Sequence, residues 1–145
     1  MHTFDPKVFK AYDVRGLYPA EINEPLAEKI GRGFVAHLDA KKIAVSRDMR
    51  LSSPSLAAAF IKGARIQGAD IVDIGLFGTD QLYYAVAKDN LDGGAQITAS
   101  HNPGEYNGFK IAVGKLTLYG KQIQEIRQVA QTGDFVHGVG EMEEL

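Results

Sequence analysis

Apolar residues recur at regular intervals along most of the chain, and the interval changes between helix-like and strand-like segments. From Leu26 to Leu38 every fourth residue is apolar. This spacing lines one face of a helix, so it predicts a helix over residues 24–39. The short apolar run at 42–46 that follows is typical of a buried strand.

Helix-like and strand-like spacings of the apolar residues continue to alternate toward the C-terminus. A second helix is expected from Ser53, because a serine followed by Pro54 resembles an N-cap with proline in the first helical position. Gly68 is expected to end that helix. The pattern then predicts, in order, a strand at 71–74, a helix around 82–86, strands at 95–99 and 109–113, and a helix around 123–130.

Strands that alternate with helices of this length indicate an α/β fold with helices on both faces of a sheet. The Asn107-Gly108 pair is a tight-turn signal, so one strand is expected to run antiparallel and the sheet to be mixed. Ligands of such sheets sit beyond the carboxyl ends of the strands. The polar loop at 100–108 follows such an end.

Composition narrows the class of protein. The 145 residues correspond to one domain, and 45% of them are hydrophobic, which is enough for a core. The net charge of −2 argues against nucleic-acid and anionic-membrane partners, and the lack of cysteine excludes disulfides and thiolate chemistry. We find no apolar run approaching a membrane span of about 18 residues and no secretory leader, so a cytoplasmic location is expected.

The last 13 residues differ in character from the rest. The segment 133–145 contains three glycines and ends in a glutamate-rich stretch. It is either a frayed terminus or the start of a linker to a second domain. We predict one domain over 1–132 and a linker over 133–145.

The segment from Thr98 to Lys110 concentrates the candidate chemistry: a hydroxyl, an imidazole, amides and a lysine. An ordinary polar surface loop remains the simplest interpretation of that composition. A serine hydrolase is disfavoured because no G-x-S-x-G motif occurs. Phosphoryl transfer suits the residue types better, since a serine can carry a phosphoryl group, a lysine neutralises phosphate and a histidine moves a proton.

Three further polar segments, 10–16, 46–54 and 75–80, carry weaker signals. The first resembles an edge strand with a surface ion pair, and the two arginines of the second are expected to be solvated or paired with an aspartate. The third lacks the glycine pattern of a nucleotide-binding loop. The four histidines are scattered, so we see no metal cage in the sequence.

Four of these segments together resemble a known family. The Thr98–Lys110 loop, with its Ser-His-Asn-Pro and Tyr-Asn-Gly-x-Lys runs, is similar to the phosphoserine loop of the α-D-phosphohexomutases, the phosphomannomutase/phosphoglucomutase family. The segments Phe9–Gly16, Arg47–Pro54 and Gly75–Tyr84 resemble further segments of that family, in the same order and spacing.

This resemblance implies a three-layer α/β/α sandwich with a mixed sheet, and it implies a mechanism. Ser100 would be the phosphorylated serine that gives its phosphoryl group to a hexose phosphate. A glucose or mannose 1,6-bisphosphate would form, reorient and return the other phosphoryl group. One Mg²⁺ would bind an oxygen of the phosphate on Ser100.

The resemblance also assigns roles to individual residues. His101 and Lys110 would assist proton transfer and stabilise charge, while Asn102 would position the loop. Tyr12 and Arg15 would border the phosphosugar site.

The family's enzymes have four domains, and this chain resembles only the first. The aspartates that hold most of the Mg²⁺ and the loop that recognises the sugar would belong to later domains, so the isolated chain is expected to be inactive. The preference between mannose and glucose phosphates stays open. The alternative function is a stand-alone phosphosugar-binding or interaction module without catalysis.

Overall fold

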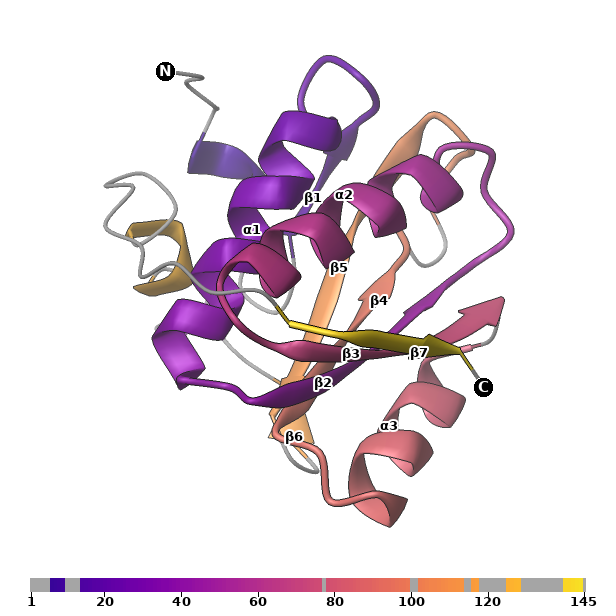
Figure 1. The fold of residues 1–145 in the computed structure, drawn as a ribbon. Coiled ribbons are helices and arrows are strands. Elements are labelled where there is room, and N and C mark those ends of the chain that lie inside the picture. The colour runs from indigo at the N-terminus through magenta and orange to yellow at the C-terminus, as the bar shows by residue number, and fades with distance from the viewer. Residues whose placement is uncertain are drawn as a thin grey trace.

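The fold is a mixed β-sheet between two layers of helices (Figure 1). The computed structural model describes residues 6–9, 14–76, 78–99, 102–113, 116–117, 125–128 and 140–144. The helices are η1 (Pro6–Val8, one 3-10 turn), α1 (Glu24–Leu38), α2 (Ser53–Ile66) and α3 (Thr79–Lys88), and residues 125–128 are also helical. The strands are β1 (Val14–Leu17), β2 (Lys42–Arg47), β3 (Asp70–Leu76), β4 (Gly93–Ile97), β5 (Tyr106–Val113), β6 (Leu116–Thr117) and β7 (Met142–Glu144).

The strand order is β1-β5-β4-β2-β3-β7, with β6 paired to β5. Strands β4, β2, β3 and β7 run parallel to one another, whereas β5 is antiparallel to β4, β1 and β6. Helices α1 and α2 cover one face and α3 the other (Figure 1). The α/β/α sandwich and the mixed sheet predicted from the sequence are therefore confirmed.

The larger core lies between the sheet and the two helices α1 and α2. Phe34 of α1 and Phe60 of α2 have ring centroids 6.2 Å apart, and Phe60 stacks on Phe109 of β5 at 5.9 Å. All three rings are fully buried. The two helices approach so closely that a Cβ on Gly63 would lie 2.0 Å from the backbone oxygen of Glu28. A smaller core of Ala44, Val72, Ile74, Leu82, Ala85, Val86 and Leu91 fills the space under α3.

The expected helices and strands occur within the described residues, although β4 ends at Ile97 and only residues 125–128 of the helix expected around 123–130 are described. Two local corrections are needed. Asn107-Gly108 is not a turn: both residues lie within β5, opposite Gly16 and Arg15. The turn comes earlier, where the amide of Tyr106 donates to the carbonyl of Pro103 at 3.0 Å. The antiparallel strand that the pair predicted is present. Asn107 does not form a turn, however, and its side-chain amide is buried among polar partners.

The second correction concerns the start of α2. Ser53 is the first residue of the helix instead of its N-cap, and its buried hydroxyl donates to Asp48 at 2.7 Å. Ser52 occupies the cap position without a side-chain capping bond. The hydroxyl of Ser53 is thus used to connect the helix to the preceding loop.

The C-terminal segment contributes a strand that the sequence pattern did not predict. Residues 142–144 form β7, which pairs parallel to β3 at the edge of the sheet (Figure 1). The arginine Nε of Arg65 and the amide of Gly140 connect this segment to the end of α2. The boundary near residue 132 and the linker beyond it stay predictions. Among the described residues, no helix is long and apolar enough to cross a membrane.

Candidate active site

The candidate site lies where β4 ends and the chain turns back into β5. Thr98 continues the line of β4, because its amide donates to the carbonyl of Gly108 on β5 at 2.9 Å. Asn102 lies beyond it, and both its backbone amide and its side-chain amide donate to the carbonyl of Ala99, at 3.1 and 2.8 Å. The residues on the two sides of Ser100 and His101 are therefore hydrogen-bonded to each other.

Three of the six predicted site residues lie within the described part of the chain. Asn102 closes the short span just described, Arg15 is on β1 and Lys110 is on β5. Ser100, His101 and Tyr12 lie outside the described residues, so their predicted roles are not tested by the fold.

The strand register brings Arg15 and Lys110 to one face of the sheet. Arg15 is opposite Gly108, which is two residues from Lys110 on β5, and Lys110 is opposite Gln96 on β4. Because side chains alternate along a strand, Arg15, Lys110 and Gln96 share the face opposite Phe109. Diagonal neighbours of this kind are about 7–8 Å apart between backbones, within reach of long side chains. Two partly exposed cationic side chains thus lie level with the last residues of β4.

A polar network behind this loop was not recognised from the sequence. It is centred on Asp48 and Arg50, which follow β2, with Arg50 donating its Nε to Asp48 at 3.1 Å. The hydroxyl of Thr98 donates to the same carboxylate at 2.7 Å. Of the two states expected for the arginines of this segment, solvated or paired with an aspartate, the pairing is present for Arg50 with Asp48.

Asn107 extends the network to the start of α2. Its fully buried side-chain amide donates to the hydroxyls of Ser52 at 2.7 Å and Ser53 at 3.0 Å, while its carbonyl accepts from the amide of Gly108. A buried amide with all these partners satisfied fixes local geometry. The sequence signal for this role was present but was interpreted as a turn.

A second polar cluster connects β1, α1 and α2 beside the loop. The hydroxyl of Tyr18 donates to Glu24 at 2.5 Å, and the hydroxyl of Ser55 donates to the same oxygen at 2.8 Å. Burial alone would raise the pKa of Glu24, but these two hydrogen bonds, together with one from its own backbone amide, outweigh burial and lower the pKa. The pKa of Tyr18 is raised, chiefly by its bond to Glu24 and then by burial. The amide of Tyr18 donates to the carbonyl of Glu105, which links this cluster to the loop.

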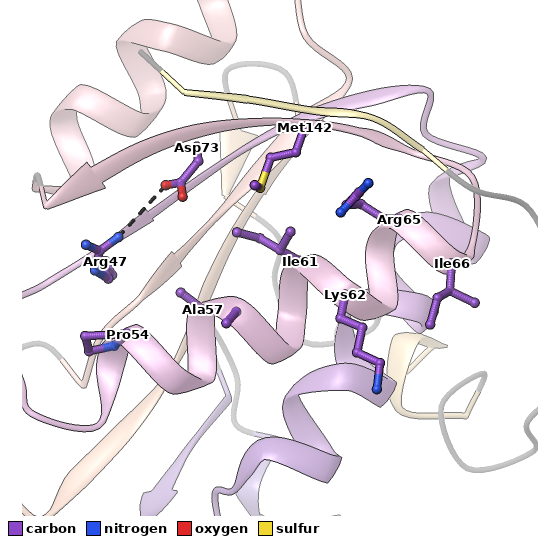
Figure 2. A pocket seen from close by; sticks show the side chains of 10 residues that line it. Arg47, Pro54, Ala57, Ile61, Lys62, Arg65, Ile66, Asp73 and Met142 are labelled. Carbon is purple, nitrogen blue, oxygen red and sulfur yellow. Dashed lines mark ion pairs between the residues drawn. The ribbon is translucent and has the colours of Figure 1, made fainter.

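A cavity of about 530 Å³ lies on the other side of α2, between that helix and strands β3 and β7 (Figure 2). At one end Arg47 faces Asp73 at 3.9 Å, Arg65 lies toward the other end, and Met142 of β7 lies between them. None of the lining residues belongs to the segment 98–110. The cavity is therefore separate from the candidate site.

The carboxylates of the described residues offer little to a metal ion at this loop. Among the described residues, no group of three or more histidine, aspartate or glutamate side chains could hold one. Asp48 lies against the loop, and both its oxygens already accept hydrogen bonds from Arg50, Ser53 and Thr98. The described residues at this loop therefore do not form a metal site by themselves.

Comparison with known proteins gives a consistent picture. Residues 6–137 match the family model described as phosphoglucomutase/phosphomannomutase, alpha/beta/alpha domain I. A phosphomannomutase of Salmonella montevideo is 41% identical over 129 residues, which cover 88% of this chain and 28% of the relative. A phosphomannomutase of Klebsiella pneumoniae is 48% identical over 103 residues, which cover 71% of this chain and 66% of the relative.

The solved structures agree with these sequence matches. The crystal structure of a phosphoglucomutase/phosphomannomutase family protein from Burkholderia thailandensis superposes with a TM-score of 0.92 at 34% identity, covering 98% of this chain and 33% of that one. The chain thus spans about a third of that structure and 28% of the first curated relative.

Proposed function

The chain belongs to the phosphoglucomutase/phosphomannomutase family as its domain I, and from that premise we propose that Ser100 carries the phosphoryl group of a phosphohexomutase. The reaction interconverts a hexose 1-phosphate and a hexose 6-phosphate, with glucose or mannose as the sugar. The phosphosugar is the substrate, and the remaining domains of the same polypeptide are the partners. We expect no nucleic-acid or membrane partner and a cytoplasmic location.

The observation that supports this proposal is that two cationic residues lie on one sheet face near the C-terminal end of β4, the strand that leads toward Ser100. Arg15 and Lys110 share one sheet face, level with Thr98 and Gln96. A phosphoserine carries about −1.5 to −2 charges at pH 7 and requires nearby positive charge. Phosphoryl transfer depends mainly on positioning and on neutralising that charge, so this arrangement supports the proposed chemistry.

In the proposed reaction, the bond between phosphorus and the Ser100 Oγ breaks as a new bond forms between phosphorus and a hydroxyl oxygen of the hexose phosphate. The sugar hydroxyl loses its proton, and the serine oxygen ends the step protonated. The resulting 1,6-bisphosphate reorients and returns its other phosphoryl group to Ser100. The net change is migration of phosphate between the two sugar positions, with the phosphoserine regenerated.

Each site residue has a defined part in this scheme. His101 moves the proton, Lys110 neutralises charge on the transferring group, and Tyr12 and Arg15 border the phosphosugar. Asn102 holds the ends of the loop together through its two bonds to Ala99. Mg²⁺ would be held by the phosphate on Ser100 together with residues of the remaining domains, and it would supply additional positive charge.

Intact mass measurement and peptide mapping test the proposal on a full-length chimera, in which residues 6–137 replace the matching region of the Escherichia coli K12 phosphomannomutase. After exposure of the chimera to glucose or mannose 1,6-bisphosphate with Mg²⁺, we expect one phosphoryl group, located on Ser100. The Ser100→Ala variant should carry none. Ser55→Ala is the matched control, because that hydroxyl bonds to Glu24 on α1 and lies outside the loop, and it should be phosphorylated like the parent. A phosphate on another residue would contradict the assignment.

A further inference from the structure

Arg50 is attached to the loop by an unusually complete set of hydrogen bonds. Its Nη1 donates to the carbonyls of Pro103 at 2.6 Å and Tyr106 at 3.1 Å, and its Nη2 donates to the carbonyl of Asn102 at 2.7 Å. With the Nε bond to Asp48, at least four of the five guanidinium N–H groups are used. The side chain is only 11% exposed. Arg50 thus holds three carbonyls of the segment 102–106, which follows Ser100 and His101.

Asp48 holds the other end of the same segment. Its Oδ2 accepts from the hydroxyl of Thr98 and from the Nε of Arg50, and its Oδ1 accepts from Ser53 and from the backbone amide of Arg50. The backbone amide of Asp48 donates to the carbonyl of Ile97 at 3.1 Å, where β4 ends. The carboxylate therefore connects the residue two positions before Ser100 to the guanidinium that binds the residues after it.

We propose that Arg50, oriented by Asp48, is the positioning residue that fixes the segment around Ser100 for phosphoryl transfer. The inference rests on the proposed function of Ser100. A reacting serine must be held closely, because small displacements of a reacting group reduce the rate steeply. Arg50 supplies that restraint from outside the loop, through backbone carbonyls, so the restraint does not depend on the side chains of Asn102, Pro103 and Tyr106.

The alternative role for an arginine at a strand end is to bind a phosphate group directly. The geometry disfavours it for Arg50, because its donors point to backbone carbonyls and to Asp48, and little of the side chain is exposed. The two roles also predict different results for a lysine substitution. A lysine keeps the charge that an anion needs, but its single ammonium cannot reach three carbonyls and a carboxylate at once.

Amide hydrogen exchange on the 145-residue chain distinguishes the two roles. In Arg50→Lys, the amides of Asn102 and Tyr106, which donate to Ala99 and Pro103, should exchange at least about tenfold faster, since even one lost bond to a charged donor has that effect. Amides of β2 and β3 should keep their rates. Arg47→Lys is the matched control: Arg47 ends β2 in the same segment, faces Asp73 and should leave the loop amides unchanged.

Asp48→Asn tests the second half of the network. An asparagine has only one acceptor oxygen in its side chain. Whichever way it is oriented, either the backbone N–H or the Nε–H of Arg50 therefore faces the side-chain NH2 group, which cannot accept a hydrogen bond. Exchange at Asn102 and Tyr106 should again increase relative to β2 and β3. The inference is overturned if loop exchange in Arg50→Lys stays within about twofold of the parent, or if loop and sheet amides accelerate equally.

The phosphorylation readout separates this inference from the proposed function. Under identical exposure of the full-length chimeras to the 1,6-bisphosphate, Ser100 should be phosphorylated at least about tenfold more slowly with Arg50→Lys than with Arg47→Lys. If the parent chimera accepts no phosphate on Ser100, the proposed function fails, and the exchange data still decide whether Arg50 positions the loop. If Ser100 is phosphorylated equally fast in both variants, the positioning role fails while the function of Ser100 stands.

Discussion

Gly108 provides a direct test of how tightly the site is packed. It lies in β5 between the buried amide of Asn107 and the ring of Phe109, opposite Arg15. A Cβ on Gly108 would lie 2.0 Å from the carbonyl oxygen of Val14 and 2.9 Å from the Cα of Arg15. Both neighbours are backbone atoms of β1, so no side chain can rotate away. Strand β1, which carries Arg15, would have to move by about 1 Å to restore a tolerable contact.

The expected cost of Gly108→Ala follows from that displacement. Overpacking of a well-packed region costs about 1–3 kcal/mol, and a clash with backbone falls at the upper end. A loss of about 3 kcal/mol in a domain of this size lowers the melting temperature by about 6–12 °C. Gly104→Ala is the matched control, because a Cβ there meets nothing within 4 Å. It should be neutral or slightly stabilising, by up to about 1 kcal/mol.

Chemical denaturation of both variants, followed by circular dichroism, measures the difference. The reasoning is refuted if Gly108→Ala unfolds at the same denaturant concentration as Gly104→Ala. In that case β1 would tolerate the added methyl group, and the glycine would not be required for the close approach of β1 to β5.

Three further expectations follow from the structure. Gly63→Ala should destabilise the chain by about 1–3 kcal/mol despite the better helix propensity of alanine, because its Cβ would lie 2.0 Å from the backbone oxygen of Glu28. A gain in stability on chemical denaturation would refute this close contact between α1 and α2. Because the pKa of Glu24 is lowered in the fold, its ionised carboxylate stabilises the chain above the unfolded pKa of about 4.3, and this stability is lost as the pH falls through the folded pKa. Glu24→Gln should therefore flatten the pH dependence of the free energy of unfolding below about pH 4.5, and an unchanged slope would count against the Tyr18 and Ser55 bonds. The isolated chain should show no mutase turnover in a coupled assay with glucose or mannose 1-phosphate, and robust Ser100-dependent conversion would contradict the need for further domains.

Much of the fold was predictable from the sequence because the apolar period reports burial directly. The helix expected over 24–39 occurs as α1 over Glu24–Leu38, since its four-residue spacing is long and regular. The strand β7 was not predicted, because three residues at a sheet edge, two of them glutamates, carry no alternation long enough to recognise. Its position depends on contacts with β3 and α2, some 70 residues earlier.

The site was predictable as a motif but not as a network. Asn107-Gly108 has the residue types of a turn, and nothing in a local window indicates that the asparagine is buried beside Ser52 and Ser53. Arg47 and Arg50 are chemically identical in the sequence, yet one faces a distant aspartate and the other binds loop carbonyls more than 50 residues away. Contacts of that sequence separation arise from the strand order, which no local pattern contains.

The most direct test of the central claim is mutase turnover in a full-length context. The matching region of the Escherichia coli K12 phosphomannomutase, which is 40% identical to this chain over 129 residues, can be replaced by residues 6–137. We predict that the folded chimera interconverts hexose 1- and 6-phosphates and that Ser100→Ala abolishes the turnover while circular dichroism stays unchanged. A folded chimera that is inactive with Ser100 in place, or one that keeps its turnover after Ser100→Ala, would contradict the account.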